Sequence, residues 1–294
     1  MKILMLSGLP ASGKSTYAAD LVKQGNWIRV NRDLLRTMLH FDKWSGPNEE
    51  MTVAIEQIIT AFALKAGKSV VVDDCNLNPK NKTMWMNLVG ETAGVTDFKH
   101  KFEHKHFDTS WQECVQRDLK REKPVGAHVI VQMALQYGLY ETPKKGFVIV
   151  DIDGTIANGS HREHHLTDGD KKDWGKYFGE MSLDLPRGDV IDRLEVLYRE
   201  GYEIIFVSGR PDTYRKDTED WFEKHNLWYR LDPITILMRR GGDKRPDTDV
   251  KREIFNRYLA KYPIHCVFDD RPSVIELWRN MGLTVEDVGK GIAF

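Results

Sequence analysis

Cysteine is scarce in this chain, and the few cysteines follow no pattern. The 294 residues include only Cys75, Cys114 and Cys266, which are widely separated and form no Cys-x-x-Cys pair. An odd number of scattered cysteines argues against a disulfide framework and against a zinc site built from cysteines. The simplest interpretation is a protein of a reducing compartment, so we expect it in the cytoplasm.

Long hydrophobic runs and a large net charge are also missing. No apolar stretch approaches the roughly 20 residues that span a bilayer, and the N-terminal segment is too short for a signal peptide, so we expect no membrane partner. The formal net charge is −1. Proteins that coat nucleic acid are strongly basic, which argues against a long nonspecific nucleic-acid track. A local basic groove at residues 238–253 stays open, as does a solvated charged loop at the same place.

What the sequence does have is an alternation of short apolar runs with segments of helical period. The first series starts with KILMLS at residues 2–7. After a break at Glu141–Gly146, the alternation resumes with FVIVD at residues 147–151. Strands that alternate with helices predict parallel sheets flanked by helices. We therefore expect an α/β protein of two domains, residues 1–142 and 143–294, each a mainly parallel sheet flanked by helices.

The segment GLPASGKS matches the pattern Gly-x-x-x-x-Gly-Lys-[Ser/Thr], between a predicted strand and a predicted helix. Small residues let backbone N–H groups converge on one concavity, and a helix N-terminus behind them favours phosphate. Lys14 would neutralise the β- and γ-phosphates of ATP, and Ser15 would hold Mg²⁺. A plain glycine-rich turn is the alternative. The residues of this loop predicted to bind ATP are Gly8, Ser12, Gly13, Lys14, Ser15 and Thr16.

Two further features of the first half suit phosphoryl transfer, and each has a structural alternative. Asp33 follows the predicted strand WIRV, and Arg36 lies one turn later on a predicted helix. Asp33 could accept the proton of an attacking hydroxyl, or it could cap the helix and pair with Arg36. Arg117 and Arg121 stand four residues apart in a helix predicted over residues 110–122. They could bind ATP as a lid, or they could face solvent.

A pair of aspartates, Asp73 and Asp74, ends the next buried strand. A carboxylate at such a strand end can support Mg²⁺ or orient an arginine. The pattern leaves open which of the two faces the site.

The second half carries a different motif, Asp151-Ile152-Asp153-Gly154-Thr155, at the end of an apolar strand. One carboxylate can attack phosphorus and form an acyl phosphate, while the other protonates the leaving oxygen and then activates water. Two carboxylates that face an anionic substrate need a cation, which implies Mg²⁺.

Later strand ends add supporting groups to this pair. Ligands of open α/β sheets bind outside the carboxyl ends of the strands, so residues from successive strand ends should meet there. Lys251 could neutralise the phosphate, and Lys244 is its competitor. The other groups expected at this site are Ser208, Arg210, Asp269 and Asp270.

Together these stretches resemble the bacteriophage polynucleotide 5′-kinase/3′-phosphatase family over nearly the whole chain and in the same domain order. The resemblance rests on GLPASGKST, NRDLLR, DDCNLNP, RDLKR, DIDGT, VSGR, VKREIF and FDDRPSVIELW. The second half alone is similar to the haloacid-dehalogenase phosphatases. The resemblance implies a P-loop kinase-like domain, a haloacid-dehalogenase-like Rossmannoid domain, and a bifunctional enzyme. That enzyme phosphorylates polynucleotide 5′-hydroxyls with ATP and hydrolyses 3′-phosphates and, more variably, cyclic phosphates.

The resemblance also implies a role for each matching residue. Asp33 would be the general base for the 5′-hydroxyl, Arg36 would bind the acceptor end, and Arg121 would stabilise the phosphoryl group in transit. Asp151 would be the nucleophile of the second domain and Asp153 its acid and base. The residues that bind substrate phosphate would be Arg162, Ser208, Gly209, Arg210 and Lys251. The metal ligands would be Asp151, Asp153, Asp269 and Asp270, with Ser15 in the kinase domain.

Two departures from the family pattern stand out: Cys75 replaces a threonine, and residues 157–185, which would form a small cap over the phosphatase pocket, match poorly. The implied partners are single-stranded DNA or RNA ends, a nucleic-acid ligase and a second copy in a homo-oligomer. The implied compartment is the host cytoplasm if a phage encodes the chain. A small-metabolite kinase fused to a phosphatase is the main alternative, and the preference for DNA or RNA stays open.

Overall fold

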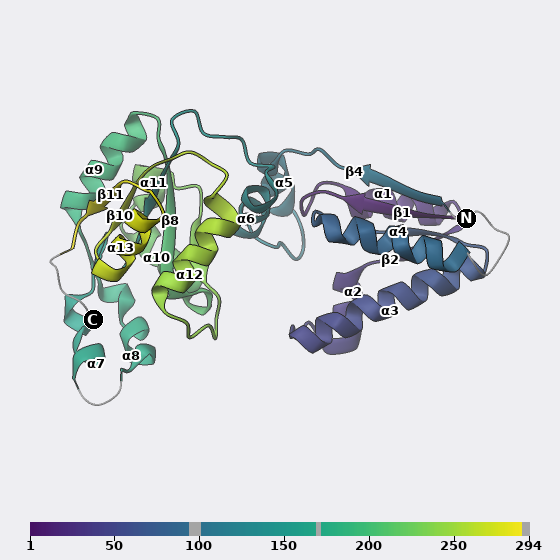
Figure 1. The fold of residues 1–294 in the computed structure, drawn as a ribbon, viewed down its shortest axis with the longest axis horizontal. Helices are drawn as coiled ribbons and strands as arrows, with labels where there is room; N and C mark the ends of the chain where they lie inside the picture. Colours follow the sequence, from purple (N-terminus) through teal and green to yellow (C-terminus); the bar gives the residue numbers. More distant parts are fainter. Residues whose placement is uncertain (94–100, 169–171, 290–294) are drawn as a thin grey trace. The chain divides into compact units, whose positions relative to one another are not determined.

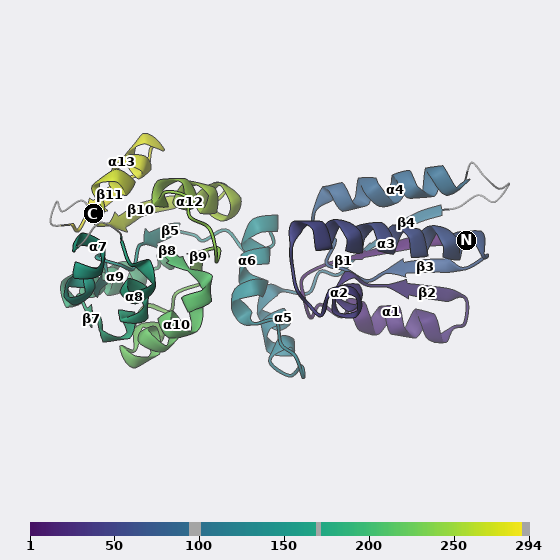
Figure 2. The same ribbon diagram turned by 90° about the horizontal axis from the view of Figure 1, so that it is seen from below.

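The computed structural model describes residues 1–93, 101–168 and 172–289. The chain divides into two compact units, Met1–Leu139 and Tyr140–Phe294. Each unit contains a parallel sheet flanked by helices (Figures 1 and 2), so the predicted α/β class of fold is confirmed. In the described residues, no helix combines the length and the apolar character needed to cross a membrane.

The sheet of the first unit has four parallel strands in the spatial order β2-β3-β1-β4. The inner strands are continuous apolar runs because both faces of the sheet are covered. The edge strand β4 is largely exposed, and its one apolar residue, Phe102, is partly buried against the core of the unit. The strands are β1 Lys2–Ser7, β2 Trp27–Val30, β3 Ser69–Val72 and β4 Lys101–His106.

Helices α3 and α4 cover one face of this sheet, and α1 covers the other. The α3/α4 side is packed around Trp85, which is fully buried, and the α1 side around Ala18. Helix α4 begins at Pro79, where the missing N–H of proline costs no helical hydrogen bond. The helices of the unit are α1 Lys14–Lys23, α2 Arg32–His40, α3 Gly46–Lys65, α4 Pro79–Ala93, α5 Trp111–Asp118 and α6 Ala127–Tyr137.

The sheet of the second unit has five parallel strands in the order β11-β10-β5-β8-β9. The central strand β5 is fully buried, and its carboxyl end leads directly into Asp151. The strands are β5 Phe147–Val150, β8 Glu203–Pro211, β9 Ile236–Arg239, β10 Ile264–Asp269 and β11 Val285–Asp287. The main helices are α9 Gly188–Arg199, α10 Arg215–Lys224, α11 Leu227–Leu231, α12 Asp247–Ile254 and α13 Pro272–Asn280.

The segment between β5 and α9 forms a small subdomain of its own. Its two ends, β6 Ala157–Asn158 and β7 Leu185–Pro186, pair antiparallel and close the segment at its base. Between them lie the short helices α7 His164–Thr167 and α8 Trp174–Gly179. Tyr177 and Phe178 are buried here in an apolar cluster with Leu166 and Met181. The weak periodicity of this stretch therefore reflects short elements joined by turns.

Candidate active sites

The first candidate site lies where β1 ends and α1 begins. Gly8 and Gly13 have φ angles of 144° and 106°, a region that side chains with a Cβ rarely adopt. A Cβ on Gly8 would lie 2.9 Å from the carbonyl oxygen of Phe107. The loop can therefore turn tightly only with glycine at this position. Because α1 begins at Lys14, its free N–H groups border the loop, as an anion site requires.

Lys14 folds back over this loop and is almost completely buried. Its ammonium donates hydrogen bonds to the carbonyl oxygens of Gly8 at 3.0 Å and Leu9 at 2.6 Å, and to Ser12 Oγ at 3.2 Å. Arg117 reaches the same loop from α5 and donates to the Ser12 carbonyl oxygen at 3.4 Å. The loop thus has two cations close to its backbone.

Ser15 and Thr16 are exposed in the first turn of α1. The structure brings the buried Asp73 to this end of the sheet, where its electrostatic neighbours are Arg29, Ser15 and Lys14. Burial raises the pKa of Asp73, and those neighbours oppose the shift. Asp73 accepts from Arg29 Nε at 2.8 Å. Of the aspartate pair, Asp73 is therefore the residue that faces the loop.

Asp74 faces the other way, toward α2. It accepts a hydrogen bond from the backbone N–H of Arg32 at 2.9 Å. The Arg32 side chain donates to Glu56, a fully buried carboxyl of α3, at 2.7 Å. These contacts join the end of β3 to helices α2 and α3.

Asp33 does not cap helix α2. The cap is Asn31, whose side-chain oxygen accepts from the Leu34 N–H at 2.9 Å. The capping alternative for Asp33 is therefore wrong. Its side chain is 85% exposed and contacts Arg36, so it has room for a further hydrogen-bond donor.

Arg36 is held in place by a residue that the sequence reasoning missed. Glu49, in the first turn of α3, accepts from Arg36 Nε at 2.7 Å and from Nη2 at 2.9 Å. The hydrogen bond with Glu49 raises the pKa of Arg36, and the nearby Asp33 adds to this effect. The spacing of residues in one sequence does not reveal this contact, because Glu49 lies on α3 and Arg36 on α2.

Arg117 and Arg121 do not share one helix face, contrary to prediction. Helix α5 ends at Asp118, and Arg121 lies in the turn that follows. The physical reason is the buried carboxylate of Asp118, which accepts from the N–H groups of Val125 at 3.2 Å and Gly126 at 2.9 Å. It also accepts from Arg121 at 3.1 Å. The chain bends around this carboxylate instead of continuing as a helix.

The second candidate site lies at the carboxyl end of β5. Lys251 of α12 is fully buried, and its ammonium lies 2.9 Å from Asp151 Oδ1 and 2.9 Å from Asp269 Oδ2. Lys244 is exposed in the loop before α12. The structure therefore brings Lys251, and not Lys244, to Asp151.

Three carboxylates at this end of the sheet fit a divalent cation. Oxygen atoms of Asp151, Asp269 and Asp270 all lie within 4.8 Å of one another. Such a set of hard oxygen donors suits Mg²⁺ or Ca²⁺. Burial raises the pKa of Asp151 well above its usual range, and although Lys251 opposes this, Asp269 and Asp270 add to it. The net rise means that Lys251 does not offset the combined effect of burial and the two neighbouring carboxylates on Asp151.

The turn that follows Asp153 packs against Asp270, one of the three carboxylates of the cluster. Thr155 donates to Asp270 Oδ1 at 3.1 Å. Gly154 has a φ angle of 81°, and a Cβ there would lie 2.0 Å from Asp270 Oδ2. Glycine at position 154 is thus a steric requirement of the carboxylate cluster, and Thr155 adds a hydrogen bond to it.

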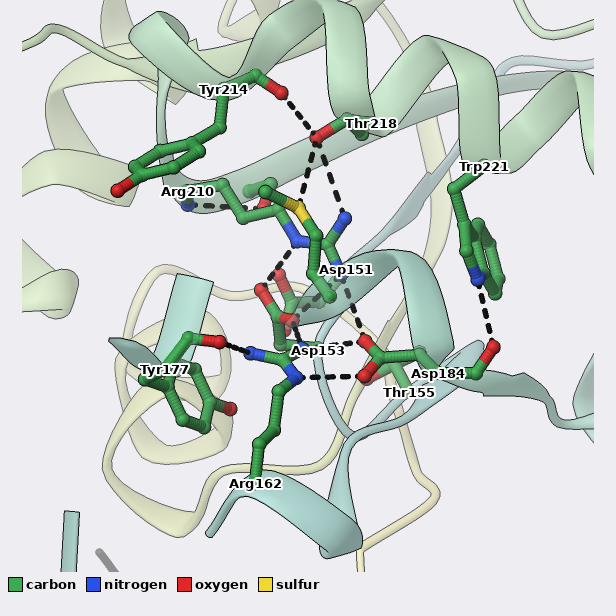
Figure 3. A network of polar contacts seen from close by, with 12 residues as sticks. Asp151, Asp153, Thr155, Arg162, Tyr177, Asp184, Arg210, Tyr214, Thr218 and Trp221 are labelled. Carbon is green, nitrogen blue, oxygen red and sulfur yellow. Dashed lines mark hydrogen bonds and ion pairs between the residues drawn. The ribbon is translucent and has the colours of Figure 1, made fainter. Parts of the chain in front are cut away.

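Asp153, expected among the metal ligands, has its carboxylate between two buried arginines (Figure 3). Arg210 donates to it through Nε at 2.9 Å and Nη2 at 2.8 Å, and Arg162 through Nη2 at 2.6 Å. Burial alone would raise the pKa of Asp153, but the two guanidinium groups outweigh it and hold the pKa well below its usual range. Asp153 is therefore ionised in this state.

Arg162 and Arg210 share a second acid that sequence reasoning missed. Asp184 is buried at the base of the subdomain and accepts from Arg162 Nε at 2.7 Å, from its Nη2 at 2.5 Å, and from Arg210 Nη2 at 3.3 Å (Figure 3). Arg162 also donates to the carbonyl oxygen of Tyr177. The arginine expected to bind phosphate thus also ties the subdomain to Asp153.

Asp247 is a further acid that the sequence reasoning missed, on the first turn of α12. Its carboxylate lies 3.6 Å from Lys251, 3.2 Å from Arg239 and 3.5 Å from Arg271. A Cβ on Gly209 would lie 2.3 Å from it. The i, i+4 spacing of Asp247 and Lys251 was the available signal.

The remaining predicted residues of this site lie on β8. Ser208 is fully buried, and its Oγ accepts from the Arg210 N–H at 3.2 Å. The carbonyl oxygen of Gly209 accepts from Arg239 at 2.8 Å. Both residues therefore shape the backbone that carries Arg210.

These features define a protein with a P-loop at the end of one parallel sheet and an aspartate pair at the end of a second, the site arrangements of phosphoryl-group chemistry. The family model of the polynucleotide kinase PNKP phosphatase domain matches residues 145–292. The chain belongs to this family. A model described as an AAA domain matches residues 3–139. The resemblance predicted from the motifs is thus confirmed.

Two curated proteins are similar to this chain. A protein of Autographa californica nuclear polyhedrosis virus, named as a bifunctional polynucleotide kinase/RNA ligase, is 28% identical over 309 residues, or 95% of this chain. A bifunctional polynucleotide phosphatase/kinase of Schizosaccharomyces pombe is 34% identical over 90 residues, or 31% of this chain. The chain spans 41% of the length of the viral protein and 18% of the yeast protein.

A solved structure described as the Pnkp1/Rnl/Hen1 RNA repair complex contains a similar chain. That chain is 27% identical, with coverage of 99% of this chain and 96% of the other, and a TM-score of 0.41.

Proposed function

We propose that this chain is a bifunctional enzyme that heals the ends of broken nucleic acids. The first unit would transfer the γ-phosphoryl group of ATP to a polynucleotide 5′-hydroxyl. The second would hydrolyse a terminal 3′-phosphate, or a 2′,3′-cyclic phosphate, through a phosphoaspartate. The observation that carries the proposal is that each unit holds its own set of groups for binding an anion. In the first unit, Lys14 donates hydrogen bonds to the loop Gly8–Ser15. In the second unit, Asp151 pairs with Lys251.

In the first unit, ATP would lie along the loop Gly8–Ser15. Lys14 can exchange the neutral carbonyl oxygens of Gly8 and Leu9 for phosphate oxygens, which form stronger, charge-assisted hydrogen bonds. Arg117 already reaches the loop and can stabilise charge on the transferred group. Ser15 and Asp73, which are neighbours in the structure, would hold Mg²⁺, and the bound ion would neutralise phosphate charge.

Asp33 would act as the general base of the kinase. Its carboxylate would accept the proton of the 5′-hydroxyl as the oxygen forms its bond to phosphorus. The exposed position of this side chain leaves room for an incoming strand end. Arg36, fixed by both of its hydrogen bonds to Glu49, would orient the acceptor beside Asp33.

In the second unit, Asp151 would attack phosphorus while the bond from phosphorus to the 3′-oxygen breaks, and the 3′-oxygen would take a proton from solvent to become a hydroxyl. Lys251 would stabilise the charge on the phosphoryl group. Asp153, kept ionised by Arg162 and Arg210, suits the second step, in which it accepts a proton from the water that hydrolyses the acyl phosphate. Mg²⁺ held by the carboxylates of the cluster would neutralise the substrate phosphate.

The two reactions convert an end pair that cannot be joined into one that can, because a ligase needs a 5′-phosphate and a 3′-hydroxyl. We therefore place DNA or RNA ends as the substrates and a nucleic-acid ligase as the functional partner. The viral relative, whose name combines kinase and ligase, supports this link. The three free thiols fit a reducing cytoplasm.

The test uses DNA and RNA oligonucleotides of one sequence, with either a 5′-hydroxyl or a 3′-phosphate end, and γ-labelled ATP. We expect label on the 5′-hydroxyl strands and release of inorganic phosphate from the 3′-phosphate strands. A small-metabolite kinase fused to a phosphatase would instead label nucleosides or other small alcohols and leave the strands unlabelled. Comparison of the DNA and RNA rates identifies the preferred substrate.

A further inference from the structure

Helix α2 carries an exposed apolar face beside Asp33. Leu34, Met38 and Phe41 are 58%, 66% and 85% exposed, and their spacing of four and three residues places them on one side of the helix. Asp33 borders this side, about two turns before Phe41. The side chain that α2 buries in its unit is Leu35. An exposed apolar patch of this kind marks a binding surface.

The turn at the end of α2 holds Phe41 in a strained conformation. Phe41 and Asp42 have φ angles of 50° and 62°, in the left-handed region that glycine usually supplies at the end of a helix. The Phe41 N–H donates to the Thr37 carbonyl oxygen at 3.1 Å, and the Thr37 hydroxyl donates to Asp42 Oδ1 at 2.6 Å. These bonds fix the turn, but the ring of Phe41 is exposed, so burial does not offset the strain. Strained residues of this kind cluster at ligand sites.

The faces of nucleic-acid bases match this surface. Aromatic side chains bind single strands because every base has a face on which they can stack. The surface continues from Asp33 and Arg36, the residues proposed to receive the 5′-hydroxyl end. Asp42 and the exposed Lys43 follow Phe41 directly, and their opposite charges balance. The surface therefore suits the bases of a strand better than its phosphates.

Helix α2 also sets the distance from the 5′ end. Phe41 follows Asp33 by eight residues, which is about 12 Å along the helix axis. Stacked bases are about 3.4 Å apart. We propose that Leu34, Met38 and Phe41 form a stacking platform for bases about three nucleotides from the 5′ end of the acceptor strand. This role rests on the proposed kinase function, because Asp33 receives the strand end only in that reaction.

The test compares acceptors of different length. Oligothymidylates of two and of ten nucleotides, both with 3′-hydroxyl ends, are phosphorylated with γ-labelled ATP, and only the longer one reaches Phe41. Phe41→Gly removes the ring but suits the positive φ angle, so it should not lower the melting temperature. We expect KM for the ten-nucleotide acceptor to rise by about tenfold relative to KM for the dinucleotide, with kcat within twofold. Phe41→Trp should restore KM, because an indole ring also stacks on bases.

The control is a second exposed phenylalanine of the same unit. Phe62 is 73% exposed near the C-terminal end of α3, more than three turns from Glu49 and therefore away from Arg36. Phe62→Ala should leave both KM values within twofold of the wild type. Equal rises of both KM values in Phe41→Gly, or a tenfold rise for the long acceptor in Phe62→Ala, would overturn the platform.

Strand binding without ATP separates the platform from the kinase reaction. The ten-nucleotide strand carries a fluorophore at its 3′ end, and its affinity is measured by anisotropy. Phe41→Gly should weaken binding by about tenfold at both low and high salt, since stacking on a base releases no counterions. If no acceptor is phosphorylated but this loss of affinity is seen, the proposed kinase function is wrong and the platform is supported. Unchanged strand binding in Phe41→Gly would overturn the platform and assign the apolar face to a protein partner.

Discussion

Nη2 of the Arg162 guanidinium lies 2.6 Å from the carboxylate of Asp153 and 2.5 Å from Asp184, which also accepts from Nε of Arg162 at 2.7 Å. Arg162 belongs to the small subdomain between β5 and α9, whereas Asp153 follows the central strand of the sheet. One side chain therefore couples the position of the subdomain to the protonation state of a proposed catalytic group. Loss of this coupling should affect the phosphatase reaction and leave the kinase reaction unchanged.

Arg162→Lys tests the coupling directly. Lysine keeps the positive charge but cannot bond Asp153 and Asp184 at once with the planar geometry of a guanidinium. We expect the rate of 3′-phosphate hydrolysis to fall by about tenfold to a hundredfold, with 5′-kinase activity within twofold of the wild type. Arg193→Lys is the matched control, because Arg193 forms an exposed pair with Glu286. Equal losses in both variants, or a loss of kinase activity in Arg162→Lys, would contradict the assignment.

The two activities should be separable by one substitution each. Asp33→Asn removes the proposed base and should lower 5′-phosphorylation by about a hundredfold or more, with unchanged 3′-dephosphorylation. Asp151→Asn removes the proposed nucleophile and should do the reverse. Both rates are measured on the same preparation with end-labelled oligonucleotides, so that each activity controls for folding of the other variant. A single substitution that abolished both activities in a folded protein would refute the model of two sites.

The carboxylate cluster predicts a specific response to metal. Chelation with EDTA should abolish both activities, and added Mg²⁺ should restore them, because both sites use a divalent cation. Asp270→Asn keeps the volume beside Gly154 but removes one anionic ligand of the cluster. We expect it to raise the Mg²⁺ concentration for half-maximal phosphatase activity by about tenfold and to leave that of the kinase unchanged. An unchanged Mg²⁺ requirement would show that Asp270 is not a metal ligand.

The groups that follow strand ends could be anticipated from sequence, because parallel strands deliver their carboxyl ends to one edge of a sheet. That rule predicts that Asp151, Asp269 and Asp270 lie close together, and the structure places them in one cluster. It did not decide between Lys251 and Lys244, since neither follows a strand: Lys244 precedes helix α12 and Lys251 lies in its second turn. The structure decides between them because α12 buries the side chain of Lys251.

The supporting acids could not be anticipated in the same way. Glu49, Asp184 and Asp247 each hold an arginine or a lysine of a proposed site. Each lies on an element other than the strand that carries the catalytic group, and its contact depends on tertiary packing. The end of α5 was also missed, because Asp118 competes for backbone N–H groups several residues later in the chain. Local propensity contains no information on such contacts.

Glu56 connects α3 to Arg32 and Asp74 and is fully buried. Burial raises the pKa of Glu56 well above its usual range, and the neighbouring Asp74 adds to the shift although Arg32 opposes it. In the unfolded chain the same carboxyl has its ordinary pKa of 4.5. The folded state therefore binds a proton that the unfolded state releases at neutral pH.

This difference predicts that the stability of the first unit falls as pH rises. The contribution of Glu56 is fully present below the unfolded pKa and is progressively lost as pH rises toward the folded pKa. Glu56→Gln keeps an acceptor for Arg32 and removes the titration. We expect similar melting temperatures for wild type and variant at pH 5, and at pH 8 a variant more stable by about 1–2 kcal/mol, measured by scanning calorimetry. Glu50→Gln, an exposed carboxyl on the same helix, should follow the wild type at both pH values. If Glu56→Gln is instead the less stable protein at pH 8, the carboxyl is ionised in the folded state and its pairing with Arg32 outweighs its burial.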